Sequence, residues 1–309
     1  MEQGLVLKST GSNYSVLTDN GEEIECKIKG KFRLQGKKNT NPIAVGDKVI
    51  LERDGKKGII SQINDRTNYI IRKSSNLSKE SHIIAANIDQ AMLMVTITMP
   101  KTLLTFVDRF LVSAEAYNIP VILLFNKIDI YSSQEIDTMN EWMNIYKDIG
   151  YRCVQLSVEK SINLYLIKEL LENKITLLSG NSGVGKSSLI NALKPSLKLK
   201  TGTLSKNHQK GKHTTTFAEM FRIENHTYII DTPGLKAFGL FDMKPWEIGH
   251  YFPEIFEHSQ KCQFKNCTHV HEPGCAVSKA VDEGIISISR FNSYLSFLDG
   301  DEEKYRYAE

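Results

Sequence analysis

The order of two short motifs constrains this chain more than any other feature. Residues 180–188 read Gly-Asn-Ser-Gly-Val-Gly-Lys-Ser-Ser, the pattern of a phosphate-binding loop, and Asn126-Lys127-Ile128-Asp129 has the pattern of a guanine-reading tetrapeptide. In ordinary GTP-binding domains the tetrapeptide follows the loop, whereas here it precedes the loop. The motifs therefore belong either to one site with permuted segments or to two unrelated turns.

The loop has the strand–helix context that phosphate binding requires. An apolar strand is expected at Ile175–Leu178 and a helix from Ser188, so backbone N–H groups can face phosphates beside a positive helix N-terminus. Lys186 can reach the β- and γ-phosphates and serve catalysis, and the Ser187 hydroxyl can ligate magnesium. The expected nucleotide-binding residues are Gly180, Asn181, Ser182, Gly183, Val184, Gly185, Lys186, Ser187 and Ser188. An ordinary glycine-rich turn is the alternative.

The tetrapeptide follows an apolar strand expected at Val121–Phe125. A carboxylate at Asp129 can accept two hydrogen bonds from the pairing edge of guanine, whereas adenine would leave this buried charge unsatisfied. Asn126 can bond the base or tie neighbouring loops together, and the Lys127 stem can cover the base face. The expected guanine-binding residues are Asn126, Lys127, Ile128 and Asp129. A polar turn between strand and helix is the alternative.

Three further segments fit the same site. The Asp231 carboxylate can support magnesium indirectly, and the Gly234 N–H can donate to the γ-phosphate. The alternative is a simple type I turn, of which Asp-Thr-Pro-Gly is also typical. Thr215, within Gly-Lys-His-Thr-Thr-Thr at 211–216, is expected to bind magnesium and the nucleotide. Ser157 and Val158 follow another apolar strand, where a weaker base contact is expected.

The complete motif order is a cyclic shift of the usual one. Strands and helices are expected to alternate between residues 91 and 178, which predicts a parallel α/β sheet. Contacts between the strands of such a sheet do not depend on where the termini fall. One permuted site therefore explains both motifs.

The two ends of the chain have different patterns. Short alternating strands are expected at Tyr14–Thr18, Ile24–Ile28, Lys48–Glu52 and Gly58–Ile63, which predicts a small β-barrel before residue 70. Near the other end, Cys262, Cys267, His269 and Cys275 offer a closed tetrahedral set of zinc ligands, with His271 competing with His269 by spacing. A disulfide is the alternative, and it is disfavoured in the cytoplasm.

Composition narrows the choice of partners. The formal charge of +3 is too small to identify one, but the acid-free stretches 26–46 and 173–218 are rich in lysine and suit phosphate-rich partners. The N-terminus lacks a signal-peptide pattern, and no apolar run approaches the ~20 residues of a membrane span. We expect a soluble, cytoplasmic protein without a membrane partner.

With these motifs, the chain resembles the circularly permuted ribosome small-subunit-dependent GTPase A family of bacteria. The resemblance covers the barrel, the permuted domain with Gly-Lys-His-Thr-Thr at 211–215, and the zinc motif. It implies an OB-fold, GTP hydrolysis stimulated by the small ribosomal subunit, late maturation of that subunit, contact with 16S rRNA, and His269 rather than His271 as ligand. Ser157-Val158 departs from the more usual Ser-Ala.

The group that activates water in hydrolysis is not part of these motifs. Many GTPases place a water-orienting glutamine after Asp-x-x-Gly, but this chain has Leu235 there. We expect slow intrinsic hydrolysis, with His213 as the catalytic candidate in this chain. A group supplied by the ribosome, or a merely solvent-exposed His213, are the alternatives. We also hypothesise that 235–240 lets GTP fix the zinc domain's orientation relative to the barrel.

The combined prediction is a monomer of three domains. It has an OB-fold RNA-binding barrel at 1–72, a circularly permuted α/β P-loop GTPase domain at 73–240, and a mainly helical zinc-binding domain at 241–309. Its expected cofactors are one zinc ion and magnesium with GTP, and hydrolysis is expected to drive release from the subunit. An ATP-using P-loop enzyme and a nucleotide-regulated RNA-binding module without meaningful catalysis are the alternatives.

Overall fold

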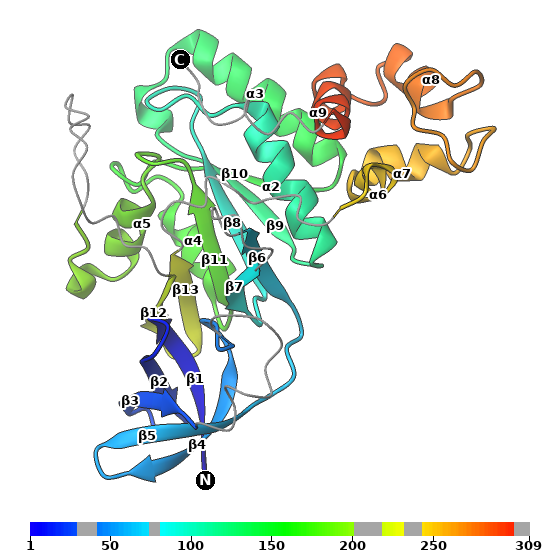
Figure 1. Ribbon diagram of the computed structural model, residues 1–309. Coiled ribbons are helices and arrows are strands. Elements are labelled where there is room, and N and C mark those ends of the chain that lie inside the picture. The colour runs from blue at the N-terminus through cyan, green and yellow to red at the C-terminus, as the bar shows by residue number, and fades with distance from the viewer. Residues whose placement is uncertain (30–41, 74–80, 201–217, 232–242, 300–309) are drawn as a thin grey trace, which may run out of the picture.

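The computed structural model describes residues 1–29, 42–73, 81–200, 218–231 and 243–299. A barrel lies at one end of a central α/β sheet, and a group of C-terminal helices packs beside helix α2 (Figure 1). This architecture confirms the predicted fold class of barrel, central P-loop-type sheet and helical C-terminal part.

Five strands close the N-terminal barrel in the order β1-β2-β3-β5-β4, with β4 returning to β1. β3 and β5 are parallel and the other neighbours are antiparallel. Buried residues alternate along β2 to β5, and Val6, Val16 and Leu51 meet in a closed core. The strand bounds are β1 (Glu2–Ser9), β2 (Tyr14–Thr18), β3 (Glu23–Ile28), β4 (Lys48–Asp54) and β5 (Lys57–Ile63).

Six strands form the central sheet in the order β10-β9-β8-β11-β13-β12. The first five are mutually parallel, as predicted, but β12 runs antiparallel to β13. Only residues 225 and 226 join these two strands, and so short a connection permits no parallel crossover. The bounds are β8 (Gln90–Val95), β9 (Val121–Phe125), β10 (Arg152–Gln155), β11 (Ile175–Gly180), β12 (Glu219–Glu224) and β13 (Thr227–Asp231).

Helices cover both faces of this sheet. Successive residues of β8 point to opposite faces, so Leu93 packs in one core cluster and Met92 in the other. Helices α2 (Leu104–Ala116) and α3 (Ser133–Asp148) cover the first face, and α4 (Leu164–Leu171) and α5 (Lys186–Leu193) cover the second. Burial on both faces explains the continuous apolar runs in the sequence.

The barrel and the central sheet share hydrogen-bonded strands. β1 pairs with β12 where Lys8 faces Glu219, and their side chains form an ion pair of 3.2 Å. The sheet therefore continues from the barrel into the central domain. A separate hairpin of β6 (Tyr69–Lys73) and β7 (Ser81–Ala86) follows the barrel.

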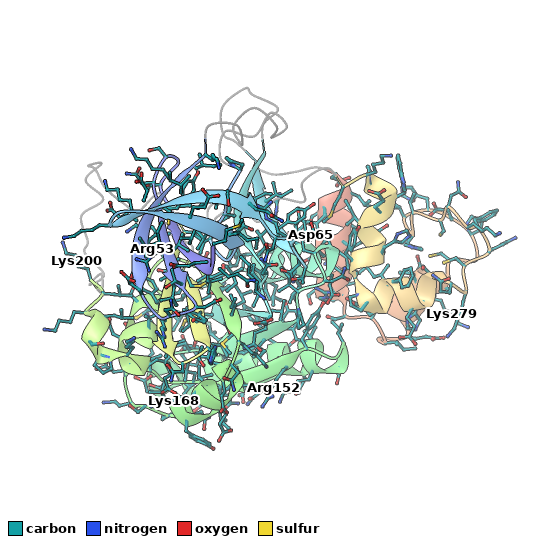
Figure 2. All side chains as sticks on the ribbon, turned by 90° about the horizontal axis from the view of Figure 1, so that it is seen from below. Arg53, Asp65, Arg152, Lys168, Lys200 and Lys279 are labelled. Atoms are coloured by element: carbon teal, nitrogen blue, oxygen red, sulfur yellow. The ribbon has the colours of Figure 1, made fainter. Side chains whose placement is uncertain are left out.

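The C-terminal helices share a core with the central domain, because Val112 of α2 is buried among their apolar side chains. Figure 2 shows this part lying to one side of the sheet, with Lys279 on it and Arg53 on the barrel. Its helices are α6 (Pro245–Ile248), α7 (Pro253–Ser259), α8 (Ala276–Asp282) and α9 (Ile288–Leu298). None of the helices within the described ranges has both the length and the apolar character that a membrane crossing demands.

Candidate functional site

The predicted nucleotide residues gather at one edge of the central sheet. Asn126 follows β9, Ser157 follows β10, and Gly180 and Asp231 end β11 and β13. These strands are parallel, so their carboxyl ends meet at the same edge. The structure thus places the tetrapeptide beside the phosphate-type loop.

The loop between β11 and α5 needs its glycines. Gly180, Gly183 and Gly185 have φ angles of 142°, 84° and 111°, which side-chain-bearing residues rarely adopt. A Cβ on Gly180 would lie 2.6 Å from the Met94 carbonyl oxygen, and one on Gly185 would lie 2.6 Å from Asn126 Nδ2. The loop is therefore packed directly against β8 and the tetrapeptide.

Lys186 opens helix α5 and folds back over the loop. Its ammonium donates to the carbonyl oxygens of Gly180 at 2.7 Å and Asn181 at 2.9 Å. Burial lowers the pKa of this ammonium, and the negative charge of Asp231 opposes that shift. Ser187 and Ser188 are half-buried in the first turn of the helix, and Ser182 is exposed at the loop tip.

Asn126 ties three segments together. It is buried, and its Nδ2 donates to the Val184 carbonyl oxygen in the phosphate-type loop at 2.8 Å. Its Oδ1 accepts from the Val158 N–H at 3.2 Å. Two roles were expected for this amide, a bond to the base and a link between neighbouring loops. The structure shows the link between the loops.

The other tetrapeptide residues lead from the sheet edge into a short turn. Lys127 has a left-handed φ of 68°, and its ammonium donates to the Met99 carbonyl oxygen at 2.5 Å. Burial lowers the pKa of Lys127, and Asp129 opposes that shift. Ile128 begins a short 3₁₀ turn at Ile128–Ile130. Asp129 Oδ1 accepts from the Ser157 hydroxyl at 2.5 Å, so Ser157 contacts the tetrapeptide directly.

Sequence reasoning missed the segment between β8 and α2. Its residues Met99 and Ile97 contact Lys127 and the Tyr131 hydroxyl. Neither residue belongs to a recognisable motif, and the spacing carried no signal for them. His213, Thr215, Gly234 and the segment 235–240 lie outside the described residues.

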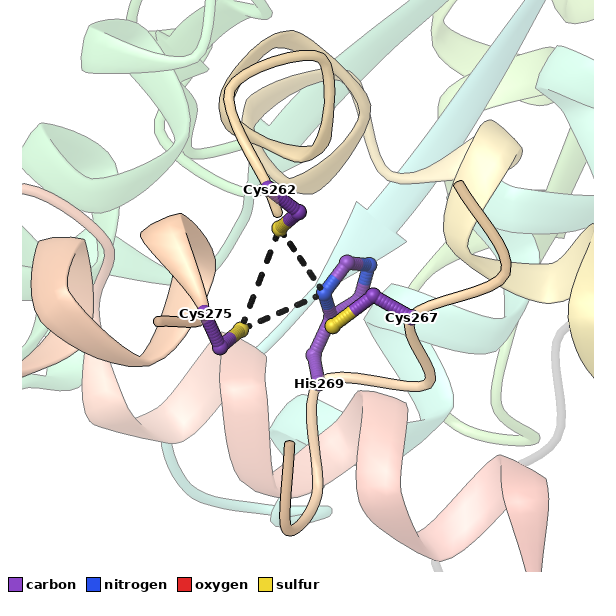
Figure 3. A group of neighbouring side chains, drawn as sticks. All are labelled: Cys262, Cys267, His269 and Cys275. Carbon is purple, nitrogen blue, oxygen red and sulfur yellow. Dashed lines mark hydrogen bonds between the residues drawn. The ribbon is translucent and has the colours of Figure 1, made fainter. Parts of the chain in front are cut away.

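The four predicted zinc ligands converge in the C-terminal part (Figure 3). Their ligand atoms all lie within 4.8 Å of one another. His269 Nδ1 lies 3.6 Å from Cys262 Sγ and 3.4 Å from Cys275 Sγ, and the two sulfurs are 4.0 Å apart. Sulfur ligands of a tetrahedral zinc ion would be separated by about 3.8 Å, so the donor set fits this metal.

The loop that carries His269 is held by a single carboxylate. Glu272 accepts from the Thr268 N–H and hydroxyl, both at 2.7 Å, and from the N–H groups of Val270 and His271. His269 is buried with its Nδ1 facing the thiols, whereas His271 is exposed. Among the described residues, the geometry therefore selects His269 over His271.

Comparison with known proteins gives matches along nearly the whole chain. The sequence model of the RsgA GTPase family matches residues 63–241, and that of the RsgA N-terminal domain matches residues 3–60. A protein named small ribosomal subunit biogenesis GTPase RsgA 2, from Bacteroides thetaiotaomicron, is 58% identical over 99% of both chains. The protein named small ribosomal subunit biogenesis GTPase RsgA from Christiangramia forsetii is 51% identical over 98% of both chains.

Two solved structures share the fold. YjeQ from Thermotoga maritima superposes with a TM-score of 0.79 at 34% identity, covering 97% of this chain and 98% of that one. YloQ, described as a circularly permuted GTPase, superposes with a TM-score of 0.73 at 30% identity, covering 99% and 96% of the two chains.

Proposed function

The chain belongs to the RsgA GTPase family, and we propose that it hydrolyses GTP to GDP and phosphate on the small ribosomal subunit during that subunit's late maturation. Contact with the subunit and its 16S rRNA stimulates hydrolysis, and hydrolysis drives release. The names of the curated relatives, which refer to small-subunit biogenesis, support this assignment.

One observation carries the guanine-nucleotide assignment. Asn126 Nδ2 reaches the Val184 carbonyl oxygen at 2.8 Å, so the tetrapeptide and the phosphate loop form a single site despite their reversed order in sequence. Neither an isolated polar turn nor an isolated glycine-rich turn would require this buried contact.

Asp129 reads the base in this proposal. A carboxylate can accept about four hydrogen bonds, so the bond from Ser157 leaves capacity for the two N–H donors of guanine. Asn126 and the Val158 N–H shape the loop around the base, while Ile128 and the stem of Lys127 lie along it.

The phosphates lie along residues 180–188. Lys186 exchanges its contacts with the Gly180 and Asn181 carbonyl oxygens for the β- and γ-phosphates, whose charge favours the ammonium form. Magnesium bound with GTP would neutralise charge on the phosphates. Ser187 and Thr215 would hold this ion with support from Asp231, Gly234 would contact the γ-phosphate, and His213 would orient the attacking water.

The remaining assignments concern the flanking parts. We propose one structural zinc ion held by Cys262, Cys267, His269 and Cys275, because four protein ligands leave no position for a reacting water. We retain 1–72, 73–240 and 241–309 as the domain limits. The first of these binds 16S rRNA, and the protein is a cytoplasmic monomer.

The direct test measures GTP hydrolysis with and without purified small ribosomal subunits, with large subunits as the control. We expect small subunits to raise turnover at saturating GTP and excess ATP to compete poorly. Equal turnover in all three conditions contradicts the proposal and favours a nucleotide-regulated RNA-binding module, an alternative that Leu235 supports.

A further inference from the structure

A tyrosine hydroxyl interrupts the ladder between β8 and β9 where the tetrapeptide begins. The two strands pair in parallel up to Val95 and Phe125, and the Asn126 N–H then donates to the Val95 carbonyl oxygen at 2.9 Å. In a regular parallel ladder the next bond would run from the Ile97 N–H to the Asn126 carbonyl oxygen. Instead, the Tyr131 hydroxyl stands between these two groups.

The hydroxyl satisfies both groups at once. It accepts from the Ile97 N–H at 2.9 Å and donates to the Asn126 carbonyl oxygen at 2.6 Å. Tyr131 is 9% exposed, and burial raises its pKa to about 12, so the phenol keeps its proton throughout the neutral range. A protonated hydroxyl is able to donate and accept together.

This insertion determines where Asn126 lies. The backbone of Asn126 is anchored on one side by β8 and on the other by Tyr131, five residues further along the chain. From this position the Asn126 side chain reaches Val184 in the phosphate loop and the Val158 N–H. The turn that Tyr131 closes also contains Lys127 and Asp129.

We propose that Tyr131 is a positioning residue for guanine recognition, whose hydroxyl separates β8 from β9 so that Asn126 ties the neighbouring loops together and Asp129 faces the base. The inference rests on the guanine-reading role assigned above to Asp129. Without the hydroxyl, Ile97 and Asn126 either pair directly, which shifts the turn towards β8, or remain buried without partners.

The test compares Tyr131→Phe with wild type for binding of GDP and of inosine diphosphate, which lacks the amino group that Asp129 reads. We expect GDP affinity to fall about tenfold, because the displaced turn gives up the equivalent of one hydrogen bond to the base. Because a displaced Asp129 gains less from that amino group, the preference for GDP over inosine diphosphate also shrinks. A purely structural role would lower the melting temperature and leave this preference unchanged.

Tyr151→Phe is the matched control. The Tyr151 hydroxyl also makes a hydrogen bond, to Glu115 Oε1 at 2.9 Å. Tyr151 itself lies in the chain between α3 and β10, outside the tetrapeptide and the phosphate loop. We expect this variant to keep the GDP preference of wild type. If Tyr131→Phe retains the same preference as Tyr151→Phe, the positioning role is wrong.

Two further measurements separate the possible failures. If Asp129→Asn binds GDP as tightly as wild type does, the guanine assignment itself is wrong. If Asp129→Asn loses GDP affinity while Tyr131→Phe keeps it, only the role proposed for Tyr131 is wrong. If Tyr131→Phe does not fold, hydrogen exchange of the Ile97 amide in wild type tests instead whether the Tyr131 contact is coupled to nucleotide binding. Slower exchange on GDP binding supports the coupling, and unchanged exchange contradicts it.

Discussion

Arg290 Nη1 of α9 donates to Asp108 Oδ1 of α2 at 2.8 Å, with both side chains sealed from solvent. The same guanidinium binds Glu254 of α7 at 2.7 and 3.2 Å, and Asp108 also accepts from the Tyr146 hydroxyl at 2.7 Å. Arg290 thus joins the C-terminal helices to the central domain. The hypothesis that 235–240 orients the zinc domain concerns residues outside the described ranges, whereas the described residues attach the C-terminal helices at α2.

Replacing Arg290 with alanine should destabilise this attachment. The change leaves the carboxylates of Asp108 and Glu254 buried without their cation, which costs about 3 to 5 kcal/mol in comparable sites. Urea denaturation followed by the fluorescence of the two tryptophans, Trp142 in α3 and Trp246 in α6, should show the loss. Arg53→Ala, which removes two partly exposed ion pairs on the barrel, with Glu2 and Glu22, is the control and should change stability little. Equal stability of the two variants contradicts this account.

Asp129→Asn should weaken GTP binding and improve tolerance of xanthosine nucleotides. The amide replaces an acceptor with a donor, which suits the additional carbonyl of xanthine and opposes the N–H groups of guanine. Competition between GTP and xanthosine triphosphate measures this exchange of preference. A variant that still prefers GTP as strongly as wild type would show that Asp129 does not read the base.

Lys186→Ala and Ser187→Ala should each abolish hydrolysis while leaving the fold intact. In the proposed site, the first removes the charge that faces the β- and γ-phosphates, and the second removes a magnesium ligand. Phosphate release in the presence of small subunits is the measurement, with Lys194→Ala, at the other end of α5, as the control. Normal turnover in either variant is incompatible with the phosphate-loop assignment.

Metal analysis should find about one zinc per chain, and Cys267→Ala should lose it. Because metal binding contributes directly to folding at such sites, the variant's C-terminal part should also unfold at lower temperature. Cys153→Ala, whose thiol lies apart from the cluster beside Met143, should retain the metal. A zinc-free, fully folded wild type would refute the assignment.

The elements predicted from sequence patterns share one property: the residues that indicate each element lie within that element. The run Val121–Phe125 is buried on both faces and was predicted with the bounds of β9. The phosphate loop and tetrapeptide likewise carry their own residue types. β1 and β12 were missed, since irregular burial and register shifts blur the alternation along them.

Contacts between distant residues left no such signal. Arg290 lies in α9, within the part predicted to be mainly helical, yet its partner Asp108 is 182 residues away. Tyr131 follows the tetrapeptide closely in sequence. Nothing in a single sequence indicates that its hydroxyl takes the place of a backbone hydrogen bond between β8 and β9. Asn126 is intermediate: a tie between loops was among its expected roles, and only the structure identified Val184 as the other end.

The shared edge of β1 and β12 also imposes an order of assembly. The barrel's own pairings, such as Glu2 with Leu51, involve residues that leave the ribosome early in synthesis, so the barrel can close first. The Lys8 end of β1 must then wait for Glu219, which is 211 residues further along the chain. During this interval the Lys8 end of β1 presents an open edge, and the charge of Lys8 discourages its pairing with another nascent chain.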